Sequence, residues 1–368
     1  MRGKGARGYP LYSWGLNEHG QLGLGDTVNR NTPQRVGNDE WLFVSAGGKH
    51  SLGINKDGYL FSWGDNRNGQ LGLGDLINRS TPTRVGDSNG WLAVSAGSNF
   101  WSQGGHSLAF HADGKLLGFG LARDGELGYM PSGSTNSVQP VEINEGSFPS
   151  IAACNRCTFV LRADNLLFCT GDGSGYQTGQ GTENDIYAFT QVGDSLWREI
   201  RKSNSGHNLM IRDDGLLFGC GRNTNGALGL GYSYEIARPS QIGSDKWITA
   251  SGGFMYSLAI REDRRLFATG DNRNKQLGLG LTDNYIVAFT QVGSSEWLTA
   301  SAGGELDMGG GHSLAIRNDK RLFVWGYNVD GELGLGDNEN RNTPVQLGND
   351  EWHAISAGGK HTLALMEV

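Results

Sequence analysis

Residues 41–86 read WLFVSAGGKHSLGINKDGYLFSWGDNRNGQLGLGDLINRSTPTRVG. Two apolar runs, Trp41 to Ala46 and His50 to Asn55, are separated by a glycine turn, and Asp57-Gly58 leads into a third run, Tyr59 to Trp63. An Asp-Gly pair between two β-rich runs is a strong hairpin signal. The stretch therefore predicts three consecutive antiparallel strands.

A fourth strand is expected after a long loop, Asn66 to Thr81. It lies around Thr83 to Val85 and is entered by Pro82, which suits the edge of a sheet because proline lacks a backbone donor. Four short antiparallel strands in a radially repeated unit are typical of a β-propeller blade.

The same pattern recurs along the whole chain, at a period of about fifty residues, and predicts one closed repeat architecture. The third run of each copy ends at a glycine: Gly15, Gly64, Gly120, Gly171, Gly221, Gly270 and Gly326. The chain begins in a third strand, Leu11 to Gly15, and ends in a second strand, His361 to Met366. Pairing of these ends in one blade would remove the exposed edges. We therefore predict an all-β fold, a seven-bladed propeller of four-stranded antiparallel blades closed by its two terminal strands.

The expected organisation is a flexible basic segment, residues 1–8, followed by a single propeller domain, residues 9–368. The predicted blades are 352–368 with 9–36, 41–86, 91–143, 148–193, 197–243, 247–293 and 297–348. With a net charge of −7 the chain has no basic stripe for nucleic acid. It contains neither an apolar run of about 20 residues for a membrane span nor a signal peptide, so we expect a cytoplasmic protein or one assembled into a particle.

Aromatic residues precede the innermost strand of every copy and are expected to wedge between neighbouring blades as an inter-blade core. They are Trp41, Trp91, Phe148, Trp197, Trp247, Trp297 and Trp352. Cys154 and Cys157 form a CxxC, yet each occupies a structural position of the repeat. Together with Cys169 and Cys220 they are interpreted as buried free thiols rather than as a metal site.

The blocks NxxGQLGLGD, TPxxVG, SAGxxHSLAI and DGxLFxWG together resemble the repeat of the regulator of chromosome condensation family, in the style of its bacterial and phage-encoded members. The resemblance covers nearly the whole chain and implies a seven-bladed propeller. Members of that family include an exchange factor for the Ran GTPase, a plant ultraviolet-B photoreceptor and modules of ubiquitin ligases. The photoreceptor's tryptophan-bearing turn is absent here, since the turns at Gly47 and Gly358 read GGKHS and GGKHT.

Two copies contain extra residues between the first and second strands, Ser98 to Gly105 (SNFWSQGG) and Gly304 to Gly311 (GELDMGGG). Both are expected on the face that carries the long loops, almost opposite each other across the axis. Exposed aromatic residues often dominate interface energetics, so these insertions are our candidate partner-binding site. Its residues are Asn99, Phe100, Trp101, Gln103, Glu305, Leu306, Asp307 and Met308. The alternative is that the insertions fold back and plug the channel mouth.

Five histidines recur at one position and are interpreted as structural, with packing and hydrogen bonds inside each blade: His50, His106, His207, His312 and His361. Cys157 and Tyr256 replace this histidine without an evident compensation. The Asn and Asp residues before the loop glycines are interpreted as turn formers that bond their own backbone, because a calcium loop needs alternating ligands.

The sequence shows no catalytic set and indicates no cofactor and no metal. We therefore predict a non-catalytic scaffold that presents one face to a protein partner of unknown identity, in an unknown oligomeric state. Two alternatives remain open: a structural component of a larger assembly such as a phage virion or tail, and a guanine-nucleotide exchange factor for a small GTPase.

Overall fold

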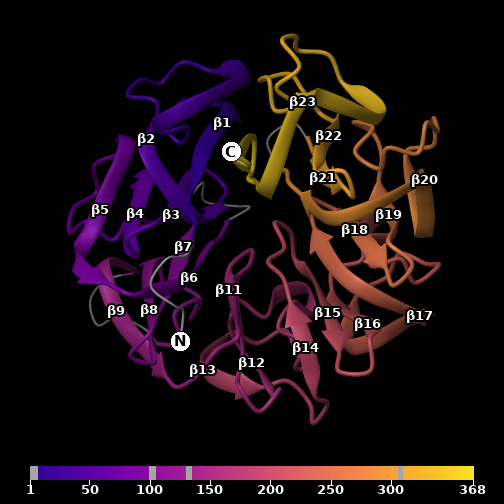
Figure 1. The fold of residues 1–368 in the computed structure, drawn as a ribbon. Coiled ribbons are helices and arrows are strands. Elements are labelled where there is room, and N and C mark those ends of the chain that lie inside the picture. The colour runs from indigo at the N-terminus through magenta and orange to yellow at the C-terminus, as the bar shows by residue number, and fades with distance from the viewer. Residues whose placement is uncertain (1–6, 99–104, 130–134, 306–309) are drawn as a thin grey trace.

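The computed structural model describes residues 7–98, 105–129, 135–305 and 310–368, and the basic segment 1–8 therefore falls largely outside the described residues. The strands are arranged around a central axis, and the chain follows the ring from β1 to β24 (Figure 1). The strands are β1 (Tyr9–Gly15), β2 (Arg30–Ala46), β3 (His50–Asn55), β4 (Tyr59–Gly64), β5 (Arg79–Asn89), β6 (Trp91–Ala96), β7 (His106–His111), β8 (Lys115–Leu121), β9 (Asn136–Glu145), β10 (Ser150–Ala153), β11 (Cys157–Leu161), β12 (Leu167–Gly171), β13 (Ile186–Gln191), β14 (Trp197–Ile200), β15 (His207–Arg212), β16 (Leu216–Gly221), β17 (Ile236–Gly252), β18 (Tyr256–Arg261), β19 (Arg265–Asp271), β20 (Tyr285–Ala302), β21 (His312–Arg317), β22 (Arg321–Gly326), β23 (Arg341–Ala357) and β24 (His361–Met366). Two 3-10 turns, η1 (Ser174–Tyr176) and η2 (Thr224–Gly226), are the helical segments among the described residues.

The predicted all-β propeller is confirmed. Every strand pairs antiparallel with its neighbour, and the pairings form seven groups of four. The termini share one group, because β1 pairs with β24 in the register Leu11↔Leu365 to Gly15↔His361. We number this shared group blade 1 and count onward along the chain.

The outer strands are longer than the sequence predicted. The one expected around Thr83 to Val85 runs from Arg79 to Asn89 as β5, so Pro82 lies inside it. In β2, β17, β20 and β23 the outer strand of one blade continues directly into the inner strand of the next. Continuous strands therefore join blades 5, 6, 7, 1 and 2, whereas blades 3 and 4 are separate four-stranded sheets.

The predicted inter-blade core is also present. Trp91, at the start of blade 3, packs with Leu52, Leu60 and Val85 of blade 2. Trp352 packs in the same way against Leu322 of blade 7. The other aromatic residues at this position are similarly buried. Burial of one such aromatic side chain contributes on the order of 3 kcal/mol, so these positions stabilise the propeller as a whole.

The recurring histidines join blades, which corrects the prediction that they bond within their own blade. His50 Nε2 lies 2.9 Å from Ser107 Oγ of the next blade, and His361 Nε2 of blade 1 lies 3.0 Å from Ser51 Oγ of blade 2. His106, His207 and His312 repeat the contact. Tyr256, which replaces a histidine, does have a compensation, because its hydroxyl donates to the His312 carbonyl at 2.6 Å.

Candidate functional site

One end of the propeller carries the turns between first and second strands, and we call it the loop face. These turns bond to one another around the axis: Gly359 N donates to Gly47 O at 3.0 Å and Gly48 N donates to Gly97 O at 3.1 Å. The first residue of each insertion, Ser98 or Gly304, takes part in this series of hydrogen bonds, since Arg156 N donates to Ser98 O and Gly304 N donates to Gly358 O. The two insertions therefore start from the same face.

Most residues of the predicted partner-binding site lie outside the described residues: Asn99, Phe100, Trp101, Gln103, Leu306, Asp307 and Met308. Glu305 is described and partly buried. Its carboxylate lies against the turn at Gly359, where an added Cβ would come within 2.7 Å of Oε2. One predicted site residue thus reaches the neighbouring blade at the inner edge of the loop face.

Exposed apolar side chains gather on the connections between third and fourth strands. Among the described residues, eight of the twelve exposed large apolar side chains lie on these connections or on the first two residues of the fourth strand that follows: Val28, Leu76, Ile77, Tyr187, Tyr234, Leu281, Tyr285 and Val329. We call this set the apolar rim. It was missed from the sequence because its members differ in type and precede no recurring glycine.

The loops of the rim are internally fixed by asparagine, as predicted. Asn66 Nδ2 donates to Asp75 O at 2.9 Å, and its Oδ1 accepts from Leu71 N at 3.0 Å. Asn17 and Asn328 make the same pair of bonds in their own loops. These side chains bond loop backbone, so Val28, Leu76, Ile77 and Val329 lie on loops with a fixed conformation.

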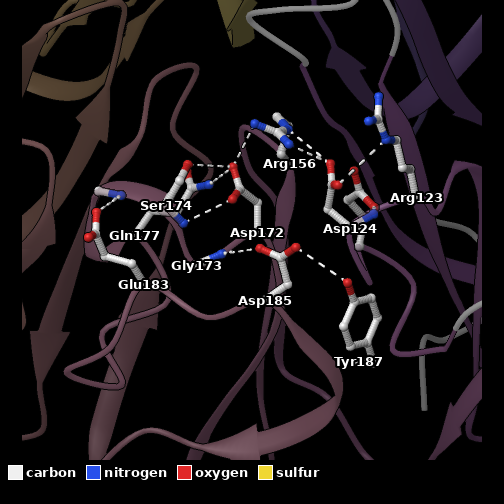
Figure 2. A network of polar contacts seen from close by, with 12 residues as sticks. Arg123, Asp124, Arg156, Asp172, Gly173, Ser174, Gln177, Glu183, Asp185 and Tyr187 are labelled. Carbon is white, nitrogen blue, oxygen red and sulfur yellow. Dashed lines mark hydrogen bonds and ion pairs between the residues drawn. The ribbon is translucent and has the colours of Figure 1, made fainter.

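A charged network crosses from blade 3 to blade 4 on the loop face. Figure 2 shows Arg156 between Asp124 and Asp172, with ion-pair distances of 2.6 and 2.8 Å. Nearby Asp185 accepts from Gly173 N and from Tyr187 Oη. Burial, together with the charges of Asp172 and Asp124, raises the pKa of Asp185. Arg156 thus pairs with one carboxylate of each blade, at a boundary that no continuous strand crosses.

Two buried carboxyls, Glu126 and Glu332, occupy a position that is glutamine in four of the other five blades. Gln70 donates to Asp65 at 3.0 Å, and its Oε1 accepts from Asn68 N at 2.9 Å. Glu332 keeps only the second contact, from Asp330 N at 2.9 Å, and its Oε1 has no partner among the described residues. Burial raises the pKa of Glu332 to about 8, and that of the equivalent Glu126 to about 7.

A lysine crosses the central axis, and the sequence interpretation did not anticipate it. Lys202 of blade 5 occupies the position that is Ala46, Ala96, Ala153, Gly252, Ala302 or Ala357 in the other six blades. Its Nζ donates to the carbonyls of Ala46 and Ala357, on the far side of the ring. Asn204 Nδ2 reaches Gly358 O in the same direction, at 3.5 Å.

The signal for this lysine was present in the spacing. Trp197 and His207 are ten residues apart, whereas Trp41 and His50 are nine apart, and Arg201-Lys202 occupies the place of two small residues of the repeat.

A cavity of about 410 Å³ lies on the axis, between the Lys202 crossing and the hairpin end of the inner strands. Its polar lining includes Ser45, Ser95, Ser251, Ser301 and Ser356, together with Arg198, Glu199 and Arg201.

Comparison with known sequences agrees with this architecture. Four segments, residues 10–54, 57–101, 214–260 and 319–365, match the regulator of chromosome condensation (RCC1) repeat. A second form of the same repeat matches residues 43–70 and 305–332. Among the described residues, no helix combines the length and apolarity that crossing a lipid bilayer requires.

Individual relatives are distant. The ultraviolet-B receptor UVR8 of Arabidopsis thaliana is 27% identical over 63% of this chain, which spans about half (53%) of that receptor. The regulator of chromosome condensation of Xenopus laevis is 25% identical over 98% of this chain and 91% of its own length. The structure of Prp20p from Saccharomyces cerevisiae superposes with a TM-score of 0.85 at 17% identity, covering 98% of this chain and 92% of Prp20p.

Proposed function

Because this chain belongs to the regulator of chromosome condensation (RCC1) repeat family, we propose that it is a non-catalytic ring that binds a protein partner through its loop face. The observation that carries the proposal is the apolar rim, which concentrates exposed aromatic and aliphatic side chains on one face. Exposed aromatic residues such as Tyr187, Tyr234 and Tyr285 are frequent energetic anchors of protein interfaces.

Rigidity of the face supports the same proposal. Ser51 Oγ donates to Gln21 O and Ser107 Oγ donates to Gln70 O, so each second strand is bonded to a loop of the preceding blade. A surface held in one conformation loses little entropy on docking. The inner insertions and the outer apolar rim would then engage the partner together.

The test is capture of partners from the native source by an immobilised chain. The double variant Phe100→Ala/Trp101→Ala should lose the captured protein, and Leu76→Ser/Ile77→Ser should weaken capture independently. Leu196→Ala is the matched control, because Leu196 is an exposed apolar residue at the hairpin end, where Asp213 N donates to its carbonyl. Equal losses in all three variants would contradict the assignment of the loop face. Recovery of a virion or tail particle would identify the partner as a larger assembly.

A second candidate is guanine-nucleotide exchange on a small GTPase. It is supported by the match to regulators of chromosome condensation along nearly the whole chain, and by Prp20p, a structural neighbour studied for its binding to Gsp1p and histones. Accelerated release of a fluorescent GDP analogue from a small GTPase would demonstrate this activity. Release at the spontaneous rate for every GTPase of the source organism would exclude it.

A further inference from the structure

Of the three cationic side chains in the central channel, two have no carboxylate partner among the described residues. The third, Arg201, is paired with Glu199 at 2.6 Å. Lys202 and Arg198, in contrast, donate to backbone carbonyls alone, Arg198 to that of Trp247. Carbonyl dipoles compensate an ammonium group less completely than a counter-charge does. The channel wall therefore carries two cations more than its anions.

A ring of serine hydroxyls lies beside these cations. Ser45 Oγ accepts from Ala96 N, Ser95 Oγ from Ala153 N, and Ser356 Oγ from Ala46 N, each at 2.9 to 3.0 Å. Ser251 and Ser301 make the same contact. Because each serine oxygen accepts a hydrogen bond from a backbone amide, its own hydroxyl group can still donate one. No acceptor among the described residues takes this hydrogen bond.

Blade 5 interrupts this ring with charge. The position of the serine in blade 2, Ser45, is Arg201 in blade 5, and the adjacent small residue is Lys202. The wall thus combines five hydroxyl donors with three cationic side chains around a cavity of about 410 Å³. A cavity of this size accommodates a small metabolite rather than a protein segment.

We propose that the channel is a binding site for a small oxyanion, a phosphate or carboxylate group, held by Lys202 and the serine hydroxyls. Oxyanions accept several charge-assisted hydrogen bonds at once, which fits a cation surrounded by hydroxyl donors. The site is separate from the loop face, because Lys202 and Asn204 cross the axis between the cavity and that face.

Anion binding should also change the protonation of Lys202, which is a second property of the site that can be measured. Burial lowers the pKa of Lys202 to about 8, so the amine is partly neutral at pH 8. His50, His312 and His361 approach the same amine from blades 2, 7 and 1, and burial lowers the pKa of each of them, so they remain neutral. A bound anion favours the ammonium form, and binding at pH 8 should therefore take up protons.

The experiment is calorimetric titration of the full chain at pH 8 with inorganic phosphate, with succinate, and with chloride at matched ionic strength. We expect saturable heat for phosphate, succinate or both, and a binding enthalpy that changes with the ionisation enthalpy of the buffer. Response to phosphate alone identifies a phosphate site, and response to succinate alone identifies a carboxylate site.

Lys202→Ala should abolish the saturable heat, and it should fold because five other blades have alanine at this position. Lys202→Met preserves side-chain length if alanine proves unstable. Lys115→Ala is the control, since Lys115 pairs with Glu142 on the outside of blade 3. Absence of saturable heat up to about 10 mM of either anion, or unchanged binding by both Lys202 variants, would overturn the proposal.

Discussion

Replacement of Glu332 by glutamine should stabilise the protein progressively as the pH rises. Burial raises the pKa of this carboxyl from 4.5 to about 8, so the folded state keeps a proton that the unfolded chain has released. Such a group stabilises the fold fully below pH 4.5, and this stabilisation is lost as the pH approaches 8. At 1.36 kcal/mol per pH unit, the loss between pH 5 and pH 8 is roughly 4 kcal/mol. Glutamine does not titrate and retains the acceptor for Asp330 N, as Gln70 does for Asn68 N.

The assay is urea unfolding followed by tryptophan fluorescence at pH 5 and at pH 8. The free energy of unfolding of Glu332→Gln, relative to the natural chain, should increase between these two values by several kcal/mol. Gln70→Glu is the reciprocal variant, and it should be destabilised at pH 8 because it places a carboxylate beside Asp65. A difference between Glu332→Gln and the natural chain that is constant from pH 5 to pH 8 would refute the buried, protonated carboxyl.

Acidification should destabilise the propeller, because burial lowers the pKa of His50, His106 and His312 to about 3 and that of His207 to about 4. The stability that these neutral side chains contribute above pH 6.5 is therefore lost as the pH falls toward 4. Urea midpoints that do not change between pH 7 and pH 4.5 would contradict this prediction. Gly64→Ala should cost about 2 kcal/mol or more, because Gly64 has φ +102° and an added Cβ would lie 2.7 Å from Lys49 O, whereas Gly37→Ala, with open space at φ +58°, should cost about 1 kcal/mol in the same unfolding assay. Trp352→Ala should lower stability by about 3 to 5 kcal/mol and Trp352→Phe by much less, since Phe148 fills the equivalent position in blade 4; comparable losses for the two variants would argue against packing as the role of this ring.

The repeat pattern predicted the architecture because every blade depends on the same local chemistry. The Asp57-Gly58 turn, the small inner strand at Ser45 and the buried aromatic at Trp41 are short-range requirements that recur in each copy, so seven imperfect copies reinforce one interpretation. Closure was predictable for a similar reason, since the terminal fragments supply complementary strands of one unit.

Contacts between blades could not be predicted in the same way. The histidine position was recognised, yet its partner Ser107 lies 57 residues further along the chain, and only folding determines which blade it faces. The raised pKa of Glu332 likewise depends on its burial and on the nearby charge of Asp330, which are properties of the three-dimensional environment.

The sequence alone determined that the chain is a closed seven-bladed ring with two enlarged turns, because local turn and strand signals repeat with a fixed period. Only the tertiary structure revealed that Lys202 crosses the axis to Ala46 and Ala357, since these residues are more than 150 positions away. Convergence of side chains on the axis is a property of ring closure. The chemistry of the channel therefore arises from residues whose proximity no local pattern encodes.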